Sequence, residues 1–167
     1  MAQHTRLALA RFLAIHTTRH ALLAELHGAL QPAHHHGQDS PPAQQSHSGC
    51  RHEHKTIDTN PEEYIQQVIA IATSGLIEIR DEAKLLIHIL GSDLNRADLA
   101  GLLGRIEALQ ADSIAEYLQQ SLLCRKARVE ERDYSARLAG HQQKLDALAQ
   151  AIAGLAEEVQ AELADLP

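Results

Sequence analysis

Residues 60–91 read NPEEYIQQVIAIATSGLIEIRDEAKLLIHILG, and this stretch carries the clearest helix signal in the chain. Asn60 suits an N-cap, Pro61 suits the first helical position, and Glu63 is placed to complete a capping box. The apolar residues that follow recur at spacings of three, four and seven, the period of an amphipathic helix. They are Ile65, Val68, Ile69, Ala72, Leu76, Ile79, Ala83, Leu86 and Leu90. The pattern predicts a long helix that ends at Gly91.

A second apolar side runs along the same stretch, formed by Ile71, Ile77, Leu85 and Ile89. It predicts that the helix is buried on more than one face. Only 2% of the residues are aromatic, so the core must consist of Leu, Ile, Val and Ala. Such residues allow helices to approach closely, and we therefore expect an all-α fold with a helical hairpin or bundle as its core.

The rest of the chain divides around this helix. Residues 1–31 contain an N-terminal amphipathic helix, with apolar residues on one side and Gly28 and Pro32 marking its end. Residues 32–60 lose this periodicity and are rich in His, Pro and Gly, which predicts a long loop between the first two helices. We expect residues 61–167 to form a helical hairpin that includes a long C-terminal helix.

The C-terminal part contains a long region without proline, residues 96–166. If unbroken, a helix of this length would form a rod of roughly 105 Å, at ~1.5 Å per residue. The absence of Gly and Pro from the polar stretch 125–137 favours the rod. An antiparallel hairpin that turns within this stretch is the alternative, and Tyr134, Ser135 and Gly140 are compatible with it.

Residues 138–166 carry an apolar seam at alternating spacings of three and four, which predicts a coiled coil. The seam consists of Leu138, His141, Leu145, Leu148, Ile152, Leu155 and Val159, followed by Leu163 or Leu166. The polar His141 in such a seam can fix register or oligomeric state. The alternative is one amphipathic helix of a compact bundle.

Residues 97–115 contain a stripe of small side chains at spacings of four and three. It consists of Ala97, Gly101, Gly104, Ala108, Ala111 and Ala115. Because glycine inside an exposed helix costs roughly 0.8–1 kcal/mol relative to alanine, we expect this stripe to pack against a neighbouring helix. A weak, alanine-rich surface is the alternative.

The loop supplies the best candidate for a metal site. In CRHEH, residues 50–54, Cys50, His52 and His54 occupy alternate positions and would point to one side of an extended segment. His47 or one of the histidines at 34–36 could provide a fourth ligand. Thiolate and imidazole donors suit a transition metal such as Zn²⁺, Ni²⁺ or Cu²⁺. The spacing matches no usual zinc-finger pattern, so a flexible, proton-buffering linker is the alternative.

A second histidine set lies in the first helix. His16, His20 and His27 share one helical stripe, and ten of the twelve histidines precede residue 55. These three could share a metal with the loop. HTTRH, residues 16–20, has Thr17 where the helical metalloprotease motif needs glutamate, so we expect no such enzyme. The alternative is that these histidines border a buried apolar seam.

The composition excludes several classes of function. The net charge is −7 and no basic stripe is present, which argues against nucleic-acid binding. We find neither a secretory signal nor an apolar run that spans a membrane, and we expect a cytoplasmic protein. No catalytic motif is visible, so we expect a non-enzymatic scaffold, adaptor or assembly factor. It would form homo-oligomers and contact protein partners through helical surfaces. The alternative is a metal-binding regulator or metallochaperone.

Overall fold

The computed structural model describes residues 1–30, 61–130 and 132–167, and confirms the all-α prediction for them. Helix α1 spans Ala2–Leu30, α2 spans Pro61–His88, α3 spans Ala97–Glu130 and α4 spans Ser135–Asp165. A single π-helical turn, η1, covers Ile89–Asp93. Asn60 and the predicted loop, residues 32–60, lie outside the described residues.

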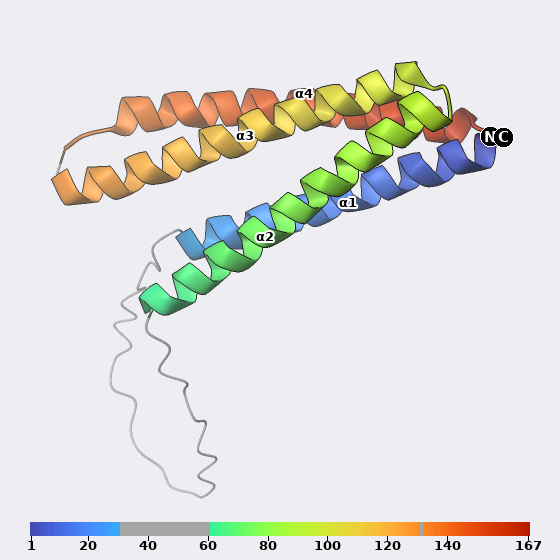
Figure 1. Cartoon of the computed structure of the whole chain (residues 1–167). Coiled ribbons are helices and arrows are strands. Elements are labelled where there is room, and N and C mark those ends of the chain that lie inside the picture. The colour runs from blue at the N-terminus through green and yellow to red at the C-terminus, as the bar shows by residue number, and fades with distance from the viewer. Residues whose placement is uncertain (31–60, 131) are drawn as a thin grey trace, which may run out of the picture.

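The four helices form two antiparallel hairpins, α1 with α2 and α3 with α4 (Figure 1). The hairpins meet at the end where both termini and the α2–α3 connection lie, which we call the closed end. They diverge toward the other end, where α1 stops and α3 turns into α4, which we call the open end. The molecule is therefore V-shaped rather than a parallel-sided bundle.

One apolar core joins the hairpins at the closed end, and all four helices contribute to it. It includes Leu9 and Phe12 of α1, Leu103 and Ile106 of α3, and Val159 of α4, each at most 1% exposed. Its other buried members lie within residues 8–15, 79–90, 99–106 and 152–159. We call residues 16–28, 63–78, 107–130 and 135–151 the open half, because none of the buried members of this core lies in these ranges. The half-buried Leu22 and Leu109 of the open half pack against the core.

The connection between the hairpins differs slightly from the prediction. Helical backbone continues past Gly91 to Asp93 in the π-helical turn, so Gly91 does not end it. Asn95 then adopts a φ of 52°, in the left-handed region that asparagine tolerates better than most residues. The Arg96 N–H donates to the Leu90 carbonyl at 2.8 Å, which closes the turn before α3.

The prediction of one unbroken rod over residues 96–166 is wrong, and the hairpin alternative is right. Helix α3 ends at Glu130 and α4 begins at Ser135. The Asp133 carboxylate accepts the Ser135 N–H at 2.8 Å, and the Tyr134 hydroxyl donates to Glu130 at 2.5 Å. These local polar contacts substitute for Gly or Pro at the turn, and folding back lets α4 bury its apolar seam.

That seam packs inside the chain. Ile152 and Val159 are buried, and Leu155, Leu163 and Leu166 pack against the closed-end core. Within the described residues α4 is therefore one amphipathic helix of the four-helix fold, which is closer to the alternative interpretation of its pattern than to a coiled coil.

Two predicted faces are not buried. On the second apolar side of α2, Ile71 is 59% exposed, Ile77 is 45% exposed and Leu85 is 57% exposed. A Cβ atom added at Gly101 or Gly104 would meet nothing within 4 Å, so the small stripe of α3 is an open surface there. Both predictions were wrong for the same reason: with two hairpins instead of a full bundle, each helix has fewer neighbours than its sequence pattern implied.

Among the described residues, no helix combines the length and the apolar character needed to cross a membrane.

Candidate functional site

The predicted histidine set is only partly brought together. The rings of His16 and His20 lie in edge contact, with centroids 4.6 Å apart. His27 instead lies against Tyr117 of α3, with ring centroids 5.2 Å apart. Cys50, His47, His52 and His54 lie outside the described residues. Within residues 1–30, 61–130 and 132–167, no three His, Cys, Asp or Glu side chains are grouped as a metal site would require.

His16 is part of a polar contact between the hairpins. The amide nitrogen of Gln110, itself 3% exposed, donates to His16 Nε2 at 3.0 Å. Burial is the main cause that lowers the pKa of His16 to about 4, and the nearby His20 and Arg19 add to it. The ring is therefore neutral at neutral pH and serves as an acceptor that ties α1 to α3.

A buried ion pair lies one turn further along α1. Arg19 is 3% exposed and donates through two nitrogens to the two carboxylate oxygens of Glu107, at 2.7 and 2.9 Å. This bidentate geometry is the strong form of an ion pair, and it engages both oxygens of the Glu107 carboxylate. Arg19 and Glu107 therefore hold α1 against α3 where the apolar core thins out.

Sequence reasoning missed this polar cluster, although one signal was available. Arg19 follows Phe12 by seven residues and Ile15 by four, which places it on the buried stripe of the first helix. A charge at such a position predicts a buried partner. Its partner Glu107 is 88 residues away and could not be identified without knowing how the hairpins are joined.

A groove of about 250 Å³ opens between the hairpins beside this cluster. We call it the interhairpin groove. Arg19 and Leu26 contribute from α1, and both are buried. Its remaining lining residues are Thr73, Leu76, Ile77 and Arg80 of α2, with Glu107, Gln110, Ala111, Ile114 and Leu118 of α3. On each helix the charged lining residue, Arg19, Arg80 or Glu107, lies nearer the closed end than the large apolar lining residues of the same helix.

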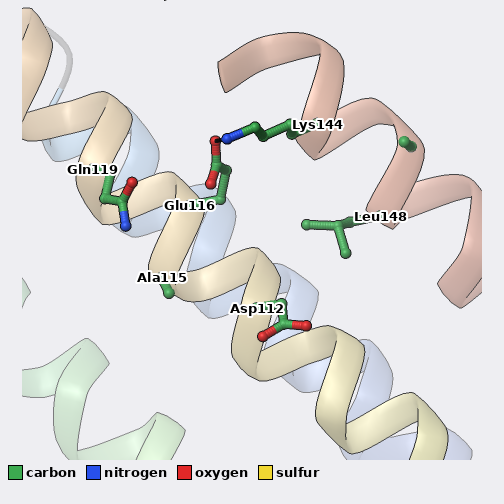
Figure 2. Close-up of a pocket in the computed structure, with 7 residues that line it drawn as sticks. Asp112, Ala115, Glu116, Gln119, Lys144 and Leu148 are labelled. Atoms are coloured by element: carbon green, nitrogen blue, oxygen red, sulfur yellow. Dashed lines mark ion pairs between the residues drawn. The ribbon is translucent and has the colours of Figure 1, made fainter. Parts of the chain in front are cut away.

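A second, wider hollow lies between α3 and α4 (Figure 2). There, Glu116 of α3 accepts from Nδ1 of His141 at 2.6 Å and pairs with Nζ of Lys144 at 3.3 Å. The hydrogen bond from His141 is the main cause that lowers the pKa of Glu116. His141, a predicted seam position, thus fixes the register of α4 on α3 within the chain, and the engaged carboxylate acts as a structural tie.

The chain matches no protein-family model, no curated protein and no solved structure at a significant level.

Proposed function

We propose that this protein is a non-enzymatic scaffold or adaptor that associates through the helical surfaces of its open half. The observation that carries the proposal is the set of large apolar side chains left exposed there. They are Ile69, Ile71 and Ile77 of α2, with Leu118 and Leu122 of α3, between 37% and 66% exposed. Ile77 and Leu118 line the interhairpin groove, and Ile69 and Leu122 continue the groove-lining stripes of α2 and α3. Ile71 adds exposed apolar area on another side of α2. The open half thus offers apolar surface that a protein could cover.

The size of this surface indicates the strength of association to expect. Complete burial of one large aliphatic side chain contributes about 1.5–3 kcal/mol. Since these five side chains are already about half buried, covering them would contribute roughly 5 kcal/mol in total. Association itself costs at least about 4 kcal/mol, so this patch alone supports reversible rather than permanent binding.

The apolar seam of α4 is not the contact surface in this proposal, because it already packs against the core. Homo-oligomers, if formed, would use the exposed faces of α2 and α3 instead. The N-terminal half of α3, with its open glycines, is a less favourable surface because it offers little apolar area to bury.

Two matched variants test the proposal. Leu122 of the open half is 66% exposed and Leu7, next to the core residues of α1, is 69% exposed, so each can be replaced by aspartate with little effect on folding. Oligomer mass would be measured by native mass spectrometry, and proteins retained from producing cells by quantitative affinity purification. We expect Leu122→Asp to lose an oligomer or a specific partner that Leu7→Asp retains. Identical masses and partner sets for both variants would contradict the proposal.

Transition-metal binding is the second candidate function, favoured by the adjacent imidazoles of His16 and His20. Neutral imidazoles one helical turn apart can bind the same Zn²⁺, Ni²⁺ or Cu²⁺ ion. Elemental analysis of tag-free protein would test it, with His16→Ala/His20→Ala as the variant and the exposed His88→Ala as the control. Stoichiometric metal that the double variant alone loses would support this function, and metal-free wild-type protein would contradict it.

A further inference from the structure

The interhairpin groove has two apolar walls and a floor. Ile77 of α2 and Leu118 of α3 face it from opposite sides and are 45% and 47% exposed, while the buried Leu26 of α1 lies between the walls. Each wall continues along its own helix: Ile69 lies two turns before Ile77, and Leu122 lies one turn after Leu118. The apolar stripes of both walls therefore continue beyond the groove toward the open end.

The volume of the groove favours anchoring side chains over a small-molecule ligand. At about 250 Å³ it falls below the roughly 300–1,000 Å³ typical of small-molecule pockets. The walls are also helices, and the described residues contain no sheet edge to which an extended peptide could add. A helix satisfies its own backbone hydrogen bonds, so it can enter an apolar groove without leaving polar groups unpaired.

The charges at the groove select the kind of helix. Glu107, the only acidic lining residue, is neutralised by Arg19. Arg80 is half exposed at the same end, and its ion pair is with its sequence neighbour Asp81. The α3 wall continues past Leu122 to the exposed Arg125. In a chain with a net charge of −7, this groove has an arginine near each end.

We propose that the interhairpin groove binds one amphipathic helix of a partner protein, with aliphatic anchors on one face and acidic residues flanking them. The anchors would pack between Ile77 and Leu118, and carboxylates would face Arg80 and Arg125. Arg80 and Gln110 both line the groove, and residues 110 and 125 are about 22 Å apart along α3 at ~1.5 Å per residue. A bound helix of about 15 residues would span that distance. This proposal rests on the proposed function and specifies its partner.

Synthetic peptides of about 15 residues would probe the groove directly. Each carries leucines at i, i+4, i+7 and i+11, with flanking positions occupied by Glu in one peptide and Lys in the other. Fluorescence anisotropy with the full chain would give both affinities. We expect the Glu peptide to bind on the order of ten-fold more tightly, because carboxylates complement the two arginines. Equal or tighter binding of the Lys peptide would overturn the proposal.

Variants locate the binding site. Leu118→Asp should weaken binding of the Glu peptide on the order of ten-fold or more, and Arg80→Glu should abolish the preference for it. Leu85→Asp is the matched control, since Leu85 is 57% exposed on α2 but does not line the groove. Equal effects of Leu118→Asp and Leu85→Asp on peptide binding would overturn the proposal. So would a dimer that forms through Leu118 and prevents the peptide from binding, because the groove would then be occupied by a second copy of this chain. If no peptide binds while Leu122→Asp still loses a partner, this inference fails and the proposed function stands.

Discussion

Removal of one member of the Arg19–Glu107 pair should destabilise the protein far more than removal of both. Arg19→Met keeps much of the aliphatic volume but leaves the Glu107 carboxylate, 15% exposed as a side chain, without its two donors. Breaking a buried ion pair in this way typically costs about 3–5 kcal/mol. Because Glu107 lines a groove that water can enter, we expect a loss near the lower limit, about 3 kcal/mol.

The double variant Arg19→Met/Glu107→Leu removes the stranded charge as well. Apolar replacement of a buried pair is often neutral, so its stability should fall within about 1 kcal/mol of wild type. Urea unfolding followed by far-ultraviolet circular dichroism would give the free energies of unfolding of the wild type, the single variant and the double variant. Arg11→Met is the control, because it breaks the more exposed ion pair between Arg11 and Glu82. A single variant as stable as wild type, or a double variant as unstable as the single, would refute the assignment of this pair as the buried link between the hairpins.

Three further predictions follow from other contacts. Leu103→Ala, at a fully buried core position, should lower the free energy of unfolding measured in urea by about 2–5 kcal/mol. The control Leu7→Ala, at an exposed position, should change it by at most ~0.5 kcal/mol. The pKa of His16 is about 4 in the folded protein, compared with an ordinary value of 6.5. Between these two pH values the unfolded chain binds more protons than the folded protein does. The free energy of unfolding should therefore decrease as the pH is lowered from 6.5 to 4. His16→Gln should make this decline shallower in urea titrations at several pH values, and an unchanged slope would contradict the buried, neutral ring. Replacing His141 with Asn should raise the pKa of Glu116 toward its ordinary 4.5, as followed by carboxyl NMR, and no change would contradict the hydrogen bond between them.

The sequence predicted the helices better than it predicted their neighbours. The periodicity of residues 61–90 and the absence of proline within the helices are local properties, and they identified α1 and α2 to within a few residues at their ends. The end of α3 at Glu130 and the start of α4 at Ser135 were harder to predict. Asp133 and Tyr134 make polar contacts at this turn that residues of the same types can also make within a helix or after it. The pattern of α4 identified a seam that packs against other helices, but it led us to expect a coiled coil, because periodicity does not distinguish a partner in the same chain from one in another.

The site could be predicted less well because it depends on contacts between the hairpins. His16 and His20 are neighbours in any helix, so their contact followed from spacing alone. Their relation to Gln110 and the burial of Arg19 beside Glu107 depend on how the two hairpins cross. The exposure of Ile77 and Leu118 likewise depends on the divergence of the hairpins, which no local pattern encodes.

Hydrogen exchange measured by mass spectrometry on the full chain tests the central claim, that the hairpins share a core at one end and leave the open half available for binding. Amide exchange should be slowest in residues 8–15, 79–90, 99–106 and 152–159, where the buried cluster lies. Residues 63–77 and 111–126 should exchange distinctly faster, and the Glu peptide should slow them selectively. Protection in those two segments equal to that of the core, without any peptide, would show that the open half is already packed and would contradict the account.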